Sequence, residues 1–329
     1  MIVNSACLTG IKAIEVRQRE LSPGPDQILV KTHAAGICGQ DKNLYNGIIP
    51  PAGGLHTEMR TPFGYPYFFG HEAGGTVVEV GGNVRAYRPG DRVIAFGWVE
   101  TYSDYFIAGE DDLEPAPEGL DMDLVALGEP VGCAVFSGLC SKVQLGDTVA
   151  VIGMGFAGQV IAQVAKKKGA HRVIGVDVVD GKLALGKQLG LDEAINSSET
   201  DPLSAILDLT GGEGADVVVE VAGTGEAVQL CNDAVKHNGT LVFYSWITQD
   251  ITLNISRWHN NSLHIVNTGL VHHGVLQRHI WVPQALRPVL LGQLDIASLV
   301  THTFPLAKID EAMETATNDP AAIKVLLRP

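Results

Sequence analysis

A glycine-rich turn constrains the fold of this chain more than any other feature. The turn is Gly153-Met154-Gly155-Phe156-Ala157-Gly158, and it lies between the β-branched run VAVI and the helical pattern QVIAQVAKKKG. In such a strand–turn–helix unit, one glycine makes the tight turn, one lets backbone N–H groups approach a pyrophosphate, and one lets the helix pack on its strand. The turn therefore predicts a parallel α/β sheet and a dinucleotide site at Gly153, Gly155, Phe156, Ala157 and Gly158.

A second strand pattern, RVIGVDV, follows that helix and contains Asp177. Asp177 lies about 20 residues beyond the turn, where a carboxylate binds the ribose 2′-hydroxyl of NAD. A carboxylate at this position also repels the 2′-phosphate of NADP. The sequence therefore favours NAD, with an ordinary strand-to-helix turn as the alternative interpretation.

The composition bounds the remaining possibilities. A chain of 329 residues with 46% hydrophobic and 18% charged residues is typical of two packed α/β domains rather than of disorder. The formal net charge of −14 disfavours nucleic acid and anionic membranes as partners. The sequence shows no secretory signal, no apolar run long enough for a membrane helix, and five scattered cysteines that suggest no disulfide framework. We therefore expect a soluble cytoplasmic protein.

The composition and the strand and helix patterns change along the chain. Residues 1–130 are rich in glycine, proline and short β-branched runs, which is typical of a β-rich domain with functional loops. Residues 131–272 alternate strand and helix patterns, which predicts a doubly wound parallel sheet. Residues 273–329 form a tail with two helix patterns and two strand patterns.

Several short motifs occur in one order along the chain: GICGQD at residues 36–41, GHE at 70–72, PGDRV at 89–93, GEP at 128–130, and then the glycine-rich turn. As a set they resemble the medium-chain dehydrogenase/reductase family, in its zinc-dependent alcohol and polyol branch of sorbitol- and threonine-dehydrogenase type. The resemblance implies a GroES-like catalytic domain over residues 1–130, an NAD-binding Rossmann domain over 131–272, and a return to the catalytic domain over 273–329. It also implies a homodimer or homotetramer.

Four residues within these motifs could bind a metal. Cys38, His71, Glu72 and Glu129 offer a thiolate, an imidazole and two carboxylates, all of which zinc accepts. The resemblance implies that Cys38 and His71 bind a catalytic zinc. The residue that matches Glu72 binds the zinc directly in some relatives and only contacts the zinc ligands in others. Glu129 stands where sorbitol-type enzymes have glutamate. Asp41 matches a carboxylate that orients the histidine.

The sequence departs from the family pattern in two ways. The segment from Gly97 to Pro117 contains no cysteine, so we expect one catalytic zinc and no structural zinc. Gln40 and Asn43 stand where relatives carry the hydroxyl and histidine of a proton relay, and a carboxamide does not readily relay a proton. His56, in an unusually long segment between Cys38 and the GHE motif, is the candidate for a relay or substrate contact.

The resemblance also implies cofactor contacts beyond the glycine-rich turn. Lys182 matches a lysine at the adenosine ribose, and Gly223 matches the strand end beside the nicotinamide side of the cofactor. Asn267 and Thr268 fall near the segment that contacts nicotinamide.

Together these features predict a zinc-dependent oxidoreductase that transfers hydride between NAD and a secondary alcohol or ketone. The expected substrate is a small polar molecule such as a polyol, cyclitol, sugar or amino alcohol. One alternative is a metal-free NAD(P)H-dependent reductase of the same fold, against which Asp177 and the metal-ligand candidates argue. Another is a non-catalytic nicotinamide-binding protein, which would accommodate Gln40 and Asn43. Such a protein would bind NADH but reduce no carbonyl compound.

Overall fold

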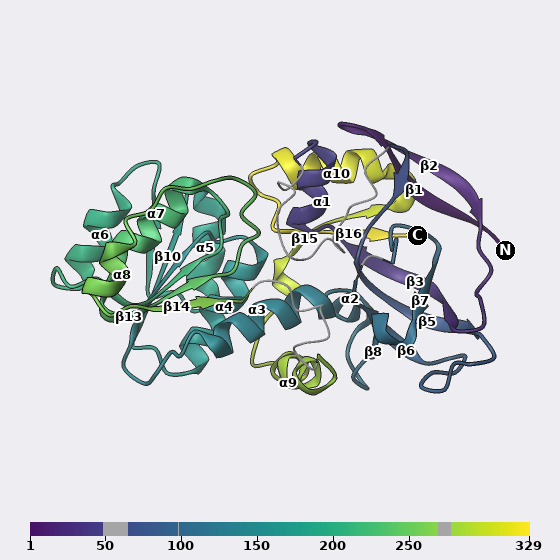
Figure 1. Ribbon diagram of the computed structural model, residues 1–329, viewed down its shortest axis with the longest axis horizontal. Coiled ribbons are helices and arrows are strands. Elements are labelled where there is room, and N and C mark those ends of the chain that lie inside the picture. The colour runs from purple at the N-terminus through teal and green to yellow at the C-terminus, as the bar shows by residue number, and fades with distance from the viewer. Residues whose placement is uncertain (49–64, 98, 269–277) are drawn as a thin grey trace. The chain divides into compact units, whose positions relative to one another are not determined.

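A computed structural model describes residues 1–48, 65–97, 99–268 and 278–329. The chain divides into two compact units, whose helices and strands are labelled in Figure 1. The first unit comprises Met1–Pro130, Gly274–Leu291 and Ile296–Pro329, and the second comprises Val131–His273 and Gly292–Asp295.

The second unit contains a six-stranded sheet in the order β11-β10-β9-β12-β13-β14, and every neighbouring pair is parallel. Its strands are β9 (Thr148–Ile152), β10 (Arg172–Asp177), β11 (Glu193–Asn196), β12 (Ala215–Glu220), β13 (Val235–Phe243) and β14 (His264–Asn267). Its helices are α3 (Gly128–Cys140, which begins in the first unit), α4 (Phe156–Lys167), α5 (Asp180–Leu189), α6 (Pro202–Leu209), α7 (Gly225–Ala234) and α8 (Ser256–Asn260).

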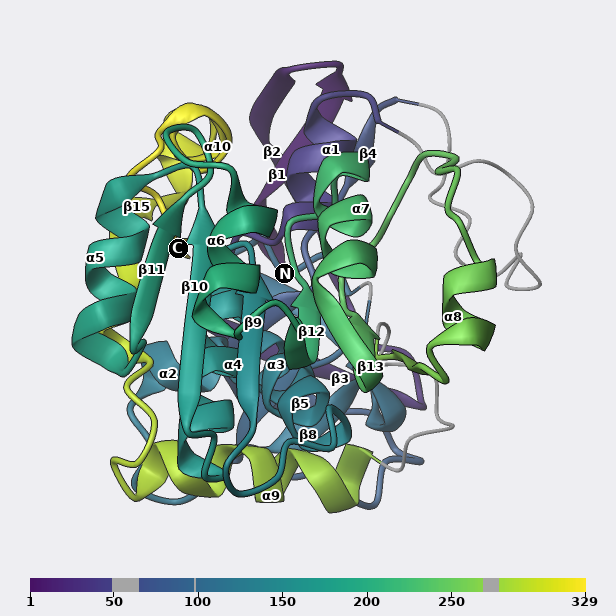
Figure 2. The same ribbon diagram turned by 90° about the vertical axis from the view of Figure 1, so that its left-hand side faces the viewer.

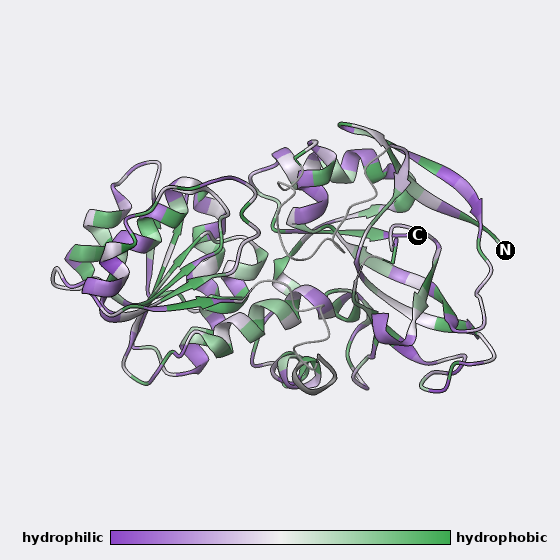
Figure 3. Ribbon diagram, in the orientation of Figure 1, coloured by the Kyte–Doolittle hydropathy of each residue, from purple (hydrophilic) through white to green (hydrophobic). Residues whose placement is uncertain are grey.

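Helices cover both faces of this sheet (Figure 2). Ala150 and Ile152 of β9 share a buried cluster with Ile206 of α6 and Cys231 of α7. Val151 points to the opposite face, toward α4. Because successive side chains of a strand point to opposite faces, a strand buried on both sides is continuously apolar. Figure 3 shows this hydrophobic colouring along the strands, and the predicted doubly wound sheet is confirmed.

The first unit contains a seven-stranded sheet, in which β15-β16-β3-β5-β6-β8 form a path and β7 pairs with β3. A smaller sheet has the order β2-β1-β4. The strands are β1 (Ile2–Gly10), β2 (Ala13–Glu20), β3 (Gln27–Gly36), β4 (Tyr67–Phe68), β5 (Glu72–Val80), β6 (Arg92–Ala95), β7 (Tyr105–Gly109), β8 (Leu113–Pro115), β15 (Val300–Pro305) and β16 (Lys324–Arg328). The helices are α1 (Gly39–Tyr45), α2 (Met122–Ala126), α9 (Arg278–Leu290) and α10 (Ile309–Asn318), with 3₁₀ turns η2 (Glu110–Asp112), η3 (Ala297–Leu299) and η4 (Leu306–Lys308).

Strand pairing in the first unit brings three distant parts of the chain together. Gly36, the last residue of β3, pairs with Glu72, the first residue of β5. Gly36 also pairs with Leu326 of β16, which lies at the other end of the sequence. A buried cluster that includes Ile28, Val93 and Met313 anchors this arrangement. None of the described helices is both long and apolar enough to cross a membrane.

Candidate metal centre and cofactor site

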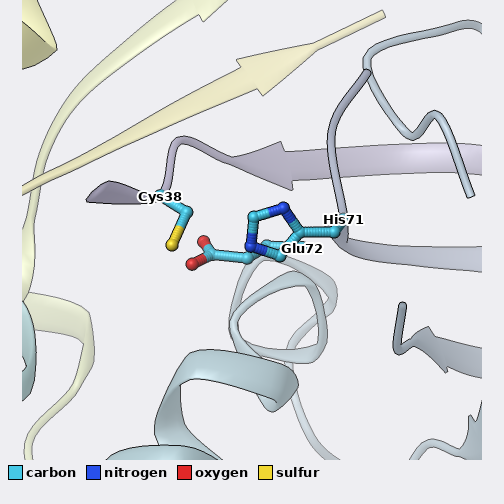
Figure 4. Close-up of side chains that lie close together, drawn as sticks. All are labelled: Cys38, His71 and Glu72. Atoms are coloured by element: carbon cyan, nitrogen blue, oxygen red, sulfur yellow. The ribbon is translucent and has the colours of Figure 1, made fainter. Parts of the chain in front are cut away.

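Three predicted metal ligands converge in the first unit. One candidate ligand atom each from Cys38, His71 and Glu72 lies within 4.8 Å of the others, and Figure 4 shows the sulfur and the carboxylate close together beside the imidazole ring. Cys38 follows β3 and is the N-cap residue of α1, while His71 immediately precedes β5. The Gly36–Glu72 pairing therefore places the chain segments that carry all three ligands side by side.

Two glycines make room for this arrangement. A Cβ atom on Gly36 would lie 2.3 Å from Glu72 Oε2, so only glycine leaves space for that carboxylate. Gly70 adopts a φ of +100° directly before His71, a conformation that side chains disfavour. The glycines of the GICGQD and GHE motifs thus have a steric role beside the ligands.

Asp41 contacts two of the candidate ligand residues, Cys38 and His71. Its fully buried carboxylate accepts hydrogen bonds at Oδ2 from the Cys38 N–H (3.1 Å) and the Tyr102 hydroxyl (2.5 Å). Its Oδ1 lies 3.5 Å from His71 Nδ1. A carboxylate at Nδ1 fixes the orientation of the imidazole ring and directs its other nitrogen to a metal. The structure therefore places Asp41 where the resemblance implies an orienting role.

The electrostatics of the group reflect its burial. Burial by itself lowers the pKa of His71, but the neighbouring Asp41 and Cys38 outweigh it and raise that pKa well above the usual value. Burial, with a further contribution from Glu72, raises the pKa of the Cys38 thiol. Because zinc binds the thiolate, metal binding at this group would release a proton from Cys38.

Lys324 forms a buried ion pair with Glu72. Its Nζ lies 2.8 Å from Glu72 Oε2 and 3.2 Å from Oε1, and it also donates to the Ile37 carbonyl at 3.2 Å. The Lys324 and Glu72 side chains are 5% and 1% exposed. Burial lowers the pKa of Lys324, but Glu72, Cys38 and Glu129 together outweigh it, so the net direction is upward.

The remaining predicted site residues of the first unit lie as follows. Glu129, in the first turn of α3, is 7% exposed and is not part of the close group of three. Its charge nevertheless contributes to the raised pKa of Lys324. Gln40 is the half-buried second residue of α1. His56 lies outside the described residues. The roles predicted for all three stay predictions.

The donor set of this group suits zinc. Thiolate, imidazole and carboxylate are the ligand types that zinc takes, and a catalytic site has three protein ligands with one position open. Cys38, His71 and Glu72 supply one of each at the required proximity. We conclude that the residues present fit a zinc ion.

The glycine-rich turn of the second unit has the geometry of a phosphate site. Gly153 adopts a φ of +107°, and a Cβ on Gly158 would lie 1.9 Å from the Gly153 carbonyl oxygen. A Cβ on Gly155, in contrast, would meet no atom within 4 Å. Gly155 is the N-cap residue of α4, and no side chain caps that helix. The N–H groups at the start of α4, which no side chain caps, therefore fit a pyrophosphate.

Asp177 ends β10 next to this turn. Its Oδ2 accepts a hydrogen bond from the Met154 N–H at 2.7 Å, and its Oδ1 accepts one from the Val179 N–H at 3.0 Å. Lys182 lies in the first turn of α5 and is half-buried. The two predicted ribose-binding residues therefore lie on adjoining segments.

The predicted nicotinamide-side residues differ in their surroundings. Gly223 has a φ of +77° in the turn after β12, and Asn267 is exposed at the end of β14. The Thr268 hydroxyl is buried and shares a 2.8 Å hydrogen bond with the Ser137 hydroxyl. The cofactor contacts proposed for these residues stay predictions.

Sequence reasoning missed Tyr102 and Lys324. Lys324 begins the apolar run VLL in the last strand, and a lone lysine beside such a run was a usable signal. Tyr102 carried no such signal, because its partner Asp41 lies 61 positions away.

Comparisons with known proteins agree with this geometry. A family profile described as "Alcohol dehydrogenase GroES-like domain" matches residues 24–176, and one described as "Zinc-binding dehydrogenase" matches residues 157–281. L-threonine 3-dehydrogenase of Bacillus subtilis is 28% identical over 98% of this chain and 95% of its own length. Sorbitol dehydrogenase of Halalkalibacterium halodurans is 28% identical over 98% and 96%.

A solved structure from Sinorhizobium meliloti, described as a zinc-binding dehydrogenase bound to NADP, has a TM-score of 0.85. It is 25% identical, and the match covers 100% of both chains. The two profiles together extend from residue 24 to residue 281 and account for both units. The chain is therefore a member of the zinc-dependent medium-chain dehydrogenase family, an oxidoreductase whose cofactors are zinc and NAD(P).

Proposed function

We propose that this protein transfers hydride between NAD and a secondary alcohol or ketone on a small polar molecule such as a polyol, cyclitol, sugar or amino alcohol. The observation that carries the proposal is the convergence of Cys38, His71 and Glu72. The first unit then acts as the catalytic domain and the second as the cofactor domain. From the resemblance we also propose a homodimer or homotetramer, which light scattering would test.

The side chains of the candidate metal centre have distinct roles in this proposal. When bound, zinc supplies a Lewis acid that acidifies the substrate hydroxyl, and NAD supplies the hydride acceptor. Cys38 and His71 would hold the metal, together with a carboxylate from Glu72 or Glu129. Asp41 orients His71, and Lys324 neutralises Glu72.

The proton that leaves the substrate hydroxyl needs a route to solvent. The Gln40 carboxamide can hydrogen-bond the substrate oxygen but does not readily carry the proton onward. We assign the relay to His56 from its place in the sequence. Substitution of His56 by Ala should lower kcat, and added imidazole should restore part of it if the role is proton transfer.

The choice of NAD over NADP rests on Asp177. Two backbone N–H donors hold its carboxylate beside the glycine-rich turn, where a 2′-phosphate would meet a fixed negative charge. The Sinorhizobium meliloti structure contains NADP, so the two chains would differ in this preference. The ratio of kcat/KM for NAD to that for NADP should exceed one and should fall in Asp177→Ser.

The substrate class follows from the relatives. Their names, L-threonine 3-dehydrogenase and sorbitol dehydrogenase, both denote oxidation of a small polar alcohol. Elemental analysis should give one zinc per chain, and Cys38→Ser should lose it. NAD reduction should then be screened across polyols, cyclitols, sugars and amino alcohols. Turnover without zinc would favour a metal-free reductase, and NADH binding without any turnover would favour a binding protein.

A further inference from the structure

Gln159 is a buried polar residue that the reaction chemistry does not use. It lies in the first turns of α4, directly after the glycine-rich turn, and is 1% exposed. Its neighbours on the same helix include the buried apolar residues Val160 and Ile161. The amide nitrogen in such a place requires hydrogen-bond partners, because an unpaired buried donor is costly. Oε1 of Gln159 is also buried and has no hydrogen-bond partner among the described residues.

The Gln159 carboxamide donates hydrogen bonds to two different segments. Its Nε2 donates to the Met154 carbonyl in the glycine-rich turn at 3.2 Å and to the Lys182 carbonyl in the first turn of α5 at 2.8 Å. Lys182 lies 23 positions further along the chain. One side chain therefore ties together the two segments that carry the predicted pyrophosphate and ribose contacts.

The Asp177 carboxylate also forms hydrogen bonds with both of these segments. Its carboxylate accepts the N–H of Met154 and the N–H of Val179, just before α5. Met154 is thus held at both its N–H and its carbonyl, by two different side chains. This double connection fixes the backbone of the glycine-rich turn, in addition to the packing of the fully buried Met154 side chain.

We propose that Gln159 is a positioning residue for the adenosine half of the cofactor, a role that rests on the cofactor site proposed above. By fixing the glycine-rich turn against the start of α5, it sets the site before the cofactor arrives and so reduces the ordering cost of binding. An apolar residue of similar volume would fill the same space but would remove the Gln159 donor from both carbonyl groups.

Gln163 provides a matched control. It lies one turn further along α4, is 5% exposed, and also bonds a backbone segment. Its Nε2 donates to the Asp295 carbonyl at 3.0 Å, and its Oε1 accepts the Asp295 N–H at 2.8 Å. Gln159→Met and Gln163→Met therefore remove the same chemical group from the same helix, but only the first change affects the glycine-rich turn.

The test is calorimetric titration of the zinc-loaded protein with ADP-ribose, together with steady-state kinetics. Gln159→Met should weaken ADP-ribose binding and raise the KM for NAD, each about tenfold, with a much smaller change in kcat. Gln163→Met should leave both values within about twofold of the unsubstituted protein. Hydrogen exchange at residues 153–158 and 179–183 should accelerate in Gln159→Met alone.

Three results would overturn the proposal. Equal losses in the two variants would show a general stability effect, and unchanged binding by Gln159→Met would show that no positioning is needed. If the unsubstituted protein failed to bind ADP-ribose, the cofactor site itself would be wrong. Should Gln159→Met fail to fold, Gln159→Asn, which keeps the amide but shortens its reach, should show the same loss of ADP-ribose affinity.

Discussion

The buried Glu72–Lys324 ion pair beside the candidate metal centre allows a quantitative test. At roughly 3 Å and an effective dielectric constant of 20, two unit charges attract by about 5 kcal/mol. Both side chains are almost fully buried, at 1% and 5% exposed, so solvent screens them little. Removing one partner of such a pair leaves an uncompensated buried charge and costs about 3–5 kcal/mol. Lys324→Met should therefore lower the free energy of unfolding by about that amount.

The assay is a double-mutant cycle on zinc-free protein, with urea unfolding followed by fluorescence. Lys324→Met and Glu72→Gln should each destabilise the protein, and the double variant should be more stable than the sum of the two losses by at least about 2 kcal/mol. Losses that add to within about 0.5 kcal/mol would refute the ion pair as the stabilising interaction.

The pH dependence of this pair follows from the raised pKa of Lys324. Because the folded pKa exceeds the unfolded value of about 10.4, the stabilisation is fully present below that pH. It is lost as the pH rises through the folded pKa. The stability difference between the unsubstituted protein and Lys324→Met should therefore stay constant from neutral pH to about pH 10.

Three further predictions concern other parts of the chain. Tyr102→Phe removes the hydroxyl that donates to Asp41, so zinc affinity measured by chelator competition should fall at least tenfold. The zinc-free protein should also lose about 1–3 kcal/mol of stability, because the buried carboxylate keeps one donor fewer. Gly155→Ala adds a Cβ that meets no protein atom within 4 Å, so Tm should hold while NADH affinity falls at least tenfold. Asp192→Asn should cost no more than about 1 kcal/mol, because the Lys166–Asp192 pair is over one-third exposed on the lysine side. Burial raises the pKa of Asp192, but Lys166, the Val173 N–H and His171 together outweigh it, so the net direction is downward. The stability from Lys166 is therefore present above the unfolded pKa of about 3.9 and is lost as the pH falls through the folded pKa.

Each of these predictions has a clear contrary result. An unchanged zinc affinity in Tyr102→Phe would show that Asp41 needs no donor from that side. Gly82→Ala, also in open space, is the control for Gly155→Ala, and equal effects on NADH binding in both would contradict a phosphate site at the turn. A Tm difference between Asp192→Asn and the unsubstituted protein that does not shrink as the pH falls below about 3.9 would contradict an electrostatic origin.

Much of the fold could be predicted from the sequence because its signals are local. The glycine-rich turn and the run RVIGVDV predicted β9, α4 and β10, and the two strand patterns of residues 273–329 predicted β15 and β16. Each of these patterns depends on neighbouring residues, which the chain itself displays. The fold class was correct for this reason.

The residues of the candidate site could be predicted only where they lie in a short sequence motif. Cys38, His71 and Glu72 lie in motifs, and the structure brings them together. Lys324 reaches Glu72 only because β16 pairs with β3, and the two residues are 252 positions apart. The Gln159 bonds likewise depend on how the segment after β10 folds back on α4. Contacts of this kind between distant residues produce no local pattern in the sequence from which they could be predicted.

The late position of Lys324 has a consequence for protein synthesis. Glu72 is translated 252 residues before its partner, with the whole second unit in between. At roughly 5–20 residues per second, that separation corresponds to about 13–50 s. During this interval a nascent chain has Cys38, His71 and Glu72 but neither Lys324 nor β16. The three candidate ligands are therefore synthesised well before Lys324, whose ammonium group neutralises Glu72 in the folded protein.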